Sequence, residues 1–262
     1  MRISCVQMNM RFADTEYNFA HAQALIRQVF AGEHPDVILL PETWNMGFFA
    51  REGLAGLCDQ DGRRTKQTFG ALARELGVNI VAGSVANLKD GQPHNTAYIF
   101  NREGACVGEY DKTHLFSPME ENAYFRGGDS LCTFTLDGVP CGVIICYDLR
   151  FPELTRSLAL KGIAVLFMVA QWPNARIPHM QVLTQARAIE NQMFLACCNS
   201  CGANGKTRYG GSSSIIDPWG KVLAQAAAEE CSITADCDLQ CLEDIRSTIN
   251  VFRDRRPEIY QL

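Results

Sequence analysis

Two repeating patterns of hydrophobic and polar residues alternate along the first third of the chain. Short apolar runs predict three buried strands, at residues 2–9, 36–40 and 78–85. Apolar residues at helical spacing predict two intervening helices, at residues 17–30 and 66–76, and Gly77 is typical of a residue that ends a helix. Strands that alternate with helices in this way indicate an α/β fold with buried strands.

The pattern changes in the middle of the chain, where short strands follow one another in pairs. Two hairpins are predicted, one from residues 96–100 with 105–110 and one from residues 131–136 with 139–146. Helices are predicted at residues 152–161, where Pro152 suits a first helical position, and at about residues 179–192. Further strands are predicted at residues 163–169, 194–199, 211–217, 221–224 and 232–235. These elements predict a mixed pair of sheets covered by helices. Because no linker or repeat interrupts the chain, residues 1–262 are expected to form a single domain.

The helix at about residues 179–192 carries apolar residues at regular spacing. These residues are Val182, Leu183, Ala186 and Ile189. Because such a stripe usually faces the core, we expect these four side chains to point inward.

Composition and charge exclude some classes of function. The 262 residues are 47% hydrophobic and 20% charged, and the net charge is -5, so nothing favours binding to nucleic acid or to an anionic membrane. No stretch approaches the ~20 apolar residues that a membrane-spanning helix needs. The N-terminus lacks the features of a secretory signal, and many of the twelve cysteines lie in apolar runs, so we expect free thiols in a cytoplasmic protein.

Paired cysteines raise the possibility of a metal site. Cys198 and Cys201, and also Cys237 and Cys241, have spacings that can suit zinc. Because Cys198 continues an apolar strand and no histidines cluster nearby, we expect these thiols to be structural and no metal to bind.

Three short segments carry residues suited to nucleophilic catalysis. They are PETW with Glu42, YDKTHLF with Lys112, and CYDLRFPE with Cys146. Glu42 and Cys146 each follow an apolar strand, at the edge where α/β sheets bind ligands, so a carboxylate from a neighbouring strand is expected to meet the thiol. The carboxylate can take the thiol proton and return one to a leaving amine, while the lysine stabilises an oxyanion. The backbone N–H of Tyr147 is a second candidate donor to that oxyanion, provided that the chain turns sharply after Cys146.

The side chains that follow the cysteine have a simpler interpretation. Asp148, Arg150 and Glu153 are predicted to form an ion network that shapes the turn. His114 and His179 are expected to form hydrogen bonds near the pocket.

In order and separation, the three motifs resemble those of the nitrilase superfamily of carbon–nitrogen hydrolases. The resemblance covers nearly the whole chain, from VQMN near the N-terminus to RDRRPEIY near the C-terminus. The resemblance implies a four-layer αββα sandwich, in which Glu42 is the general base, Lys112 the electrophilic stabiliser and Cys146 the nucleophile. It also implies that no cofactor is needed and that the chain forms a homodimer or a larger homo-oligomer. Many members carry a second glutamate before a glycine-containing turn; the spacing to Phe125-Arg126-Gly127 favours Glu121, with Glu120 as the alternative.

The segment VAQWPNARIPHMQVLTQARAIENQMF resembles the omega-amidase branch, which hydrolyses the terminal amide of 2-oxoglutaramate-like substrates. True nitrilases usually show Trp-Glu after the cysteine, where this chain has Tyr147-Asp148, so nitrile hydrolysis is not expected. A short dicarboxylic amide needs a cation for its distal carboxylate. Arg176 is the candidate for that contact, and Trp172 is expected to wall the pocket.

These observations predict an amidase that hydrolyses the terminal carboxamide of 2-oxoglutaramate or 2-oxosuccinamate through a thioester and releases ammonia. An amidase for deaminated glutathione, an N-carbamoyl amino acid amidohydrolase, or an enzyme for a simple aliphatic amide would use the same three residues. A non-catalytic binding protein is the alternative from another class, and the intact set of Glu42, Lys112 and Cys146 argues against it. Alkylation separates the two, because a catalytic Cys146 is expected to be a low-pKa thiolate that is alkylated faster than the other cysteines. An acyltransferase is disfavoured, since the known lipoprotein-modifying branch carries membrane helices.

Overall fold

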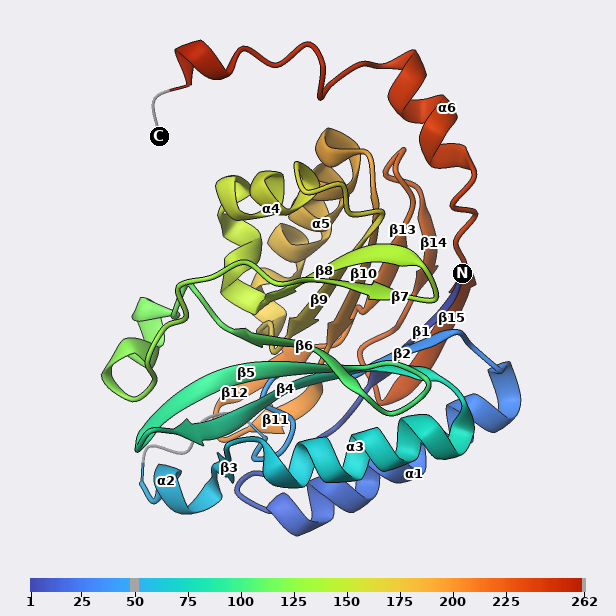
Figure 1. Cartoon of the computed structure of the whole chain (residues 1–262). Helices are drawn as coiled ribbons and strands as arrows, with labels where there is room; N and C mark the ends of the chain where they lie inside the picture. The colour runs from blue at the N-terminus through green and yellow to red at the C-terminus, as the bar shows by residue number, and fades with distance from the viewer. Residues whose placement is uncertain (48–51, 261–262) are drawn as a thin grey trace.

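Two sheets face each other, and helices cover their outer faces, in the computed structural model of residues 1–47 and 52–260 (Figure 1). Within these residues the first sheet has seven strands in the order β15-β1-β2-β4-β5-β6, with β3 beside β4. Its strands are β1 (Arg2–Gln7), β2 (Val37–Leu39), β3 (Asp59–Gln60), β4 (Asn79–Lys89), β5 (Gln92–Phe100), β6 (Cys106–Asp111) and β15 (Cys231–Asp236). β1, β2 and β4 run parallel, whereas β5 and β6 continue the sheet as antiparallel strands.

The second sheet has six strands within the described residues, in the order β14-β13-β10-β9-β8-β7. They are β7 (Thr133–Leu136), β8 (Val139–Ile145), β9 (Val165–Ala170), β10 (Phe194–Asn199), β13 (Ser214–Ile216) and β14 (Val222–Gln225). β8, β9 and β10 are parallel. A separate hairpin joins β11 (Cys201–Asn204) and β12 (Thr207–Gly210).

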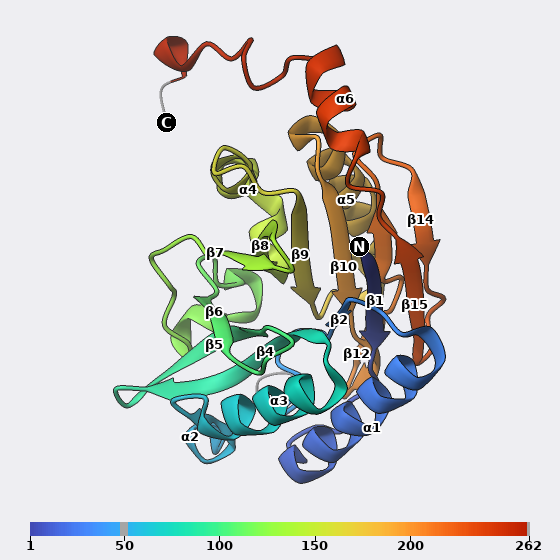
Figure 2. The same ribbon diagram turned by 45° about the vertical axis from the view of Figure 1, so that its right-hand side comes forward.

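Helices complete the four layers, as Figures 1 and 2 show. α1 (Thr15–Glu33) and α3 (Arg63–Leu76) lie on the first sheet, and α4 (Pro152–Ala159) and α5 (Ile177–Asn191) lie on the second. The shorter helices are α2 (Leu54–Leu57) and α6 (Cys241–Thr248). The αββα sandwich implied by the resemblance is therefore confirmed. No helix within residues 1–47 and 52–260 is long and apolar enough to span a bilayer.

The central strands β2, β9 and β10 are buried on both faces, which explains their continuous apolar sequences. In β9, Phe167 lies in the core between the sheets, while its neighbour Met168 packs beneath α4 and α5. In β2, Leu39 faces the central core and Ile38 faces α1 and α3. Because side chains alternate along a strand, each apolar run supplies two cores at once.

Helix ends follow local sequence. The Asp14 side chain accepts a hydrogen bond from the backbone N–H of Tyr17 at 3.0 Å and so caps the first turn of α1. α3 ends at Gly77, whose φ of 65° is the left-handed conformation that glycine adopts without strain. The predicted helices and strands are all present, with ends displaced by a few residues.

The expected inner face of α5 is wrong for Val182 and Ile189, whereas Leu183 is half-buried and packs against the core beneath the helix. Val182 is 65% exposed and Ile189 is 49% exposed. The buried side chains are instead Ile177, Met180, Thr184, Arg187, Ala188 and Asn191. Polar residues occupy this face because they have buried partners: the Arg187 guanidinium donates hydrogen bonds to the carbonyl oxygen of Leu149 at 3.0 and 3.2 Å. Spacing of apolar residues alone therefore did not identify the buried face.

Candidate active site

Glu42 follows β2 at the end of the sandwich where the parallel strands of both sheets terminate. Its carboxylate Oε2 accepts a hydrogen bond from the backbone N–H of Gln171 at 2.8 Å, and Gln171 follows β9 of the other sheet. The Gln171 side chain also donates to the carbonyl oxygen of Glu42 at 2.7 Å. Gly83 allows β4 to approach this segment, because a Cβ there would lie 2.0 Å from the carbonyl oxygen of Pro41.

The relation between Glu42 and Cys146 differs from the prediction in one respect. The two residues were expected on neighbouring strands, but β2 belongs to the first sheet and β8 to the second. The carboxylate and the thiol therefore approach each other across the sandwich. An apolar run shows that a strand is buried, but it does not show which sheet contains the strand.

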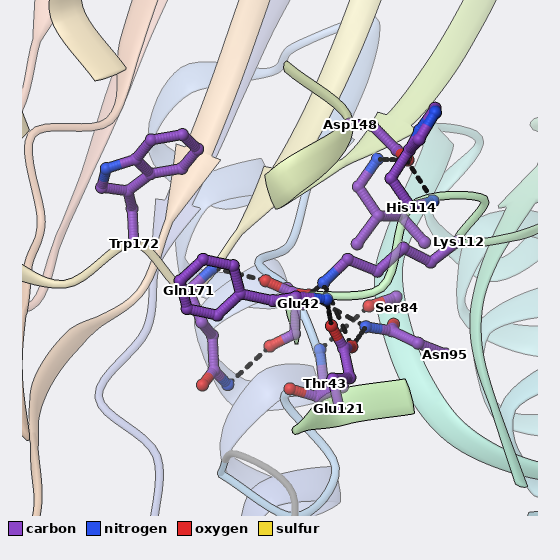
Figure 3. Close-up of polar contacts among 12 residues, drawn as sticks. Glu42, Thr43, Ser84, Asn95, Lys112, His114, Glu121, Asp148, Gln171 and Trp172 are labelled. Atoms are coloured by element: carbon purple, nitrogen blue, oxygen red, sulfur yellow. Dashed lines mark hydrogen bonds and ion pairs between the residues drawn. The ribbon is translucent and has the colours of Figure 1, made fainter. Parts of the chain in front are cut away.

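Lys112 directly follows β6 and lies between two carboxylates (Figure 3). Its Nζ is 2.8 Å from Glu42 Oε1 and 2.9 Å from Glu121 Oε2. Burial lowers the pKa of Lys112, but the carboxylates of Glu42 and Glu121 outweigh burial and hold that pKa well above its ordinary value. The lysine is therefore a buried ammonium that two glutamates share.

Of the two adjacent glutamates, Glu121 lies in the site. Its side chain is buried, and its Oε2 accepts a hydrogen bond of 2.6 Å from the backbone N–H of Phe116. Glu120 is exposed and has a φ of 59°, a left-handed conformation that turns the chain just before Glu121. This turn directs only the second glutamate toward Lys112.

Cys146 stands where β8 ends and a 3₁₀ turn over Cys146–Arg150 begins. Its φ is 49°, which is rare and strained for a residue other than glycine, so the chain does turn sharply at this point. The fully buried carboxylate of Asp148 fixes the turn: it accepts hydrogen bonds from Ile145 N (3.0 Å), from the Tyr110 hydroxyl (2.7 Å) and from His114 N (3.0 Å).

The predicted ion network after the cysteine is only partly present. Asp148 does shape the turn, and His114 Nδ1 lies 2.8 Å from it. Within the described chain, however, Arg150 forms no ion pair with Asp148 or with Glu153. Arg150 instead lines the pocket, with its Nη2 at 3.3 Å from Nδ1 of His179. The buried partners of Asp148 come from the Lys112 segment, which is distant in sequence.

The Cys146 thiol is protonated at rest. Burial raises the pKa of this thiol well above its ordinary value, and the nearby Glu42 carboxylate raises it further. The Lys112 ammonium and the backbone N–H of Gln171 lower it but do not compensate. The expectation of a low-pKa thiolate is therefore wrong, and a base is needed to activate the nucleophile.

Alkylation of Cys146 by iodoacetamide is consequently expected to be slow at neutral pH and to accelerate as the pH rises beyond about 9, because only the thiolate reacts. Mass spectrometry of the peptide that contains Cys146, sampled from pH 6 to 10, measures this rate. A rate that is already maximal at pH 7 would contradict the protonated resting state.

One pocket, with about 520 Å³ of space that is partly open to solvent, gathers all the candidate residues. They are Glu42, Lys112, Glu121, Cys146, Tyr147, Trp172 and Arg176. Asn95 and Phe116, which were not predicted, line the same pocket, and so does Arg150, which was predicted only to shape the turn. Asn95 left no clear signal in the sequence, because β5 also carries the polar residues Gln92, His94 and Thr96.

Aromatic rings hold the two arginines of the pocket. The Arg176 guanidinium lies 5.2 Å from the centre of the Phe116 ring, and that of Arg150 lies 5.0 Å from the Trp172 ring. The Trp172 indole N–H donates to the carbonyl oxygen of Arg176 at 2.8 Å. Neither guanidinium pairs with a carboxylate of the described residues. Both positive charges are therefore available to a ligand.

No group of three or more His, Cys, Asp or Glu side chains within residues 1–47 and 52–260 is arranged to hold a metal ion.

Similarity to known proteins extends over the whole chain. The family model for carbon–nitrogen hydrolases matches residues 2–247. A 2-oxoglutaramate amidase of Bacillus subtilis (strain 168) is 43% identical over 258 residues, which cover 98% of this chain and 98% of that protein. Omega-amidase NIT2 of Danio rerio is 30% identical over 276 residues, covering 100% of this chain and 96% of that protein. A CN-hydrolase superfamily protein of Xanthomonas campestris, solved with an arsenic adduct in its active site, matches with a TM-score of 0.91 at 28% identity, covering 100% of this chain and 98% of that chain.

Proposed function

The chain belongs to the carbon–nitrogen hydrolase family, and from that premise we propose that it hydrolyses the terminal carboxamide of a short dicarboxylic monoamide, 2-oxoglutaramate or 2-oxosuccinamate. The name of the B. subtilis relative supports this substrate class. The observation that carries the proposal is the charge of the pocket. Three cations (Lys112, Arg150 and Arg176) face two carboxylates, so the pocket has a net charge of 3 − 2 = +1 while the thiol is neutral. A substrate with one distal carboxylate neutralises this charge.

The reaction begins when Glu42 takes the proton of Cys146 and the sulfur attacks the carboxamide carbon. The ammonium of Lys112 and the backbone N–H of Tyr147 stabilise the oxyanion of the tetrahedral intermediate. Glu42 then returns the proton to the amine, the C–N bond breaks, and ammonia leaves a thioester on Cys146. Water attacks the thioester after losing a proton to Glu42, and the acid is released as the thiol is restored. Glu121 holds Lys112 in place during both steps.

The direct test is ammonia release from 2-oxoglutaramate and 2-oxosuccinamate, measured beside deaminated glutathione, glutamine and an N-carbamoyl amino acid. Fast release from the two 2-oxo amides supports the proposal. Turnover of another amide alone would replace the substrate and keep the chemistry. Release of carbon dioxide together with ammonia would identify a carbamoylase.

Replacing Arg176 by leucine is expected to raise the KM for 2-oxoglutaramate by roughly 30-fold, because a carboxylate in the pocket loses a charge-assisted partner. A neutral amide of similar length, such as butyramide, is the control substrate and should keep its KM. Steady-state kinetics with both substrates gives the comparison. An equal rise for both would mean that Arg176 shapes the pocket and does not bind the carboxylate.

The remaining parts of the proposal concern the whole molecule. We infer that residues 1–262 act as one domain, as a homodimer or a larger homo-oligomer, in the cytoplasm. The exposed Val182 and Ile189 on α5 support self-association, since large apolar side chains on one surface favour burial. All twelve cysteines are free thiols, which supports a reducing compartment.

A further inference from the structure

Asn95 lies between the two carboxylates that share Lys112 (Figure 3). It belongs to β5 and is 1% exposed. Its amide Nδ2 is 2.9 Å from Glu42 Oε1 and 3.4 Å from Glu121 Oε1. A neutral side chain therefore donates to both glutamates from inside the site.

The two carboxylates pose an electrostatic problem that Lys112 alone does not solve. Two buried negative charges share one ammonium, and such pairs tend to take up a proton on one member. Backbone donors serve one carboxylate each: Gln171 N–H binds Glu42 at 2.8 Å, and Phe116 N–H binds Glu121 at 2.6 Å. Among the described residues, only Lys112 and Asn95 donate to both carboxylates.

We propose that Asn95 is a positioning residue for the general base: its amide fixes Glu42 beside Cys146 and holds Glu42 and Glu121 apart as two separate hydrogen-bond acceptors. This inference rests on the proposed function, in which Glu42 takes the proton of Cys146. Without the amide, Glu42 loses one of the hydrogen bonds that hold it beside Cys146 and that favour the carboxylate form.

The chemistry of the amide suits this role. An NH₂ group has two hydrogens, one for each carboxylate, and no charge that would compete with Lys112. The opposite end of the group, Asn95 Oδ1, is buried and has no hydrogen-bond donor within the described chain, so nothing there favours the flipped orientation. A flip would also bring that oxygen against Glu42 Oε1, where two acceptors repel each other.

Several groups face Glu42 from the elements packed around it. They are the Lys112 ammonium, the Glu121 carboxylate, the Cys146 thiol and the backbone N–H of Gln171. The Tyr209 hydroxyl on β12 also senses Glu42 and Cys146, but burial raises its pKa far above the ordinary value, so it stays neutral. Asn95 is therefore a neutral side-chain donor, and its removal is expected to change how readily Glu42 and Glu121 bind a proton.

The test replaces Asn95 by leucine, which keeps the shape and removes both donors. We expect kcat to fall by about 30-fold, KM to change by less than about threefold, and the acidic limb of the pH profile of kcat/KM to move up by roughly one pH unit. Asn95→Asp should be worse, because it adds a third carboxylate. If the leucine variant does not fold, Asn95→Ser, which keeps one donor, should show a smaller shift of the same sign.

Asn87 provides the matched control. It is a fully buried asparagine on β4, and its side chain donates to Tyr98 Oη at 2.8 Å, away from the glutamates. Asn87→Leu should lower the melting temperature but leave the acidic limb unchanged. If the acidic limb of the pH profile lay at the wild-type position in both Asn95→Leu and Asn95→Ser, the inference would be overturned. The pH profile is measured with whichever amide the wild-type protein hydrolyses. If the wild type hydrolysed no amide at all, that result would refute the proposed function and not the role of Asn95.

Discussion

Replacing Cys146 by serine is expected to abolish ammonia release, lowering kcat/KM by at least about 10⁴-fold, while the fold stays intact. Burial already holds the Cys146 thiol in its protonated form, so its activation depends on proton transfer to Glu42. A serine hydroxyl is a far weaker acid than a thiol, and the same carboxylate cannot deprotonate it to a useful extent. Ammonia release and the melting temperature, measured on the same preparation, separate loss of chemistry from loss of fold.

Cys106→Ser is the control for this variant. Cys106 is an exposed cysteine on β6, outside the pocket, and its replacement should leave turnover unchanged. If Cys146→Ser retained more than a few per cent of the activity while Cys146→Ala had none, an oxygen nucleophile would suffice in this site. Activity in both variants would show that another residue attacks the amide.

Much of the site followed from local sequence because its residues lie directly after buried strands. The apolar runs that end before Glu42 and Cys146 predict two strands, and strand ends in an α/β fold converge on one edge. The sequence does not reveal that the two strands belong to different sheets, since both are buried on both faces. That arrangement is visible only through contacts such as the one between Gln171 N–H and Glu42, 129 residues apart in the chain.

Residues without a motif were the ones that sequence reasoning missed. Asn95 is one of several polar residues in β5, and only tertiary packing places it beside Glu42 and Glu121. Arg187 was not among the residues expected to face the core, although its guanidinium is buried against the carbonyl of Leu149. In both cases a buried polar side chain is retained because its partner comes from a distant part of the chain, and hydrophobic periodicity carries no information about that partner.

Replacing Lys112 by methionine is expected to destabilise the protein by roughly 3–5 kcal/mol and to lower kcat by at least about 10³-fold. The variant keeps the volume of the side chain but leaves Glu42 and Glu121 buried without their shared cation. One of the two carboxylates is then expected to hold a proton in the folded state that it releases on unfolding. Unfolding thus releases protons, so the stability of the variant should fall as the pH rises from about 5 to 8. Urea unfolding at several pH values measures this slope.

A second substitution separates the electrostatic effect of Lys112 from its catalytic one. Adding Glu121→Gln to Lys112→Met removes one buried charge, and Glu42 keeps the hydrogen bonds from Asn95 and from the backbone of Gln171. The double variant should therefore recover most of the lost stability, and its free energy of unfolding should no longer depend on pH in this range. It should remain inactive, because the oxyanion still lacks the ammonium of Lys112. Lys66→Met, which removes an exposed ion pair with Glu109, is the control and should cost less than about 1 kcal/mol. If Lys112→Met were as stable as the wild type at pH 8, the ammonium would not be what holds the two carboxylates together.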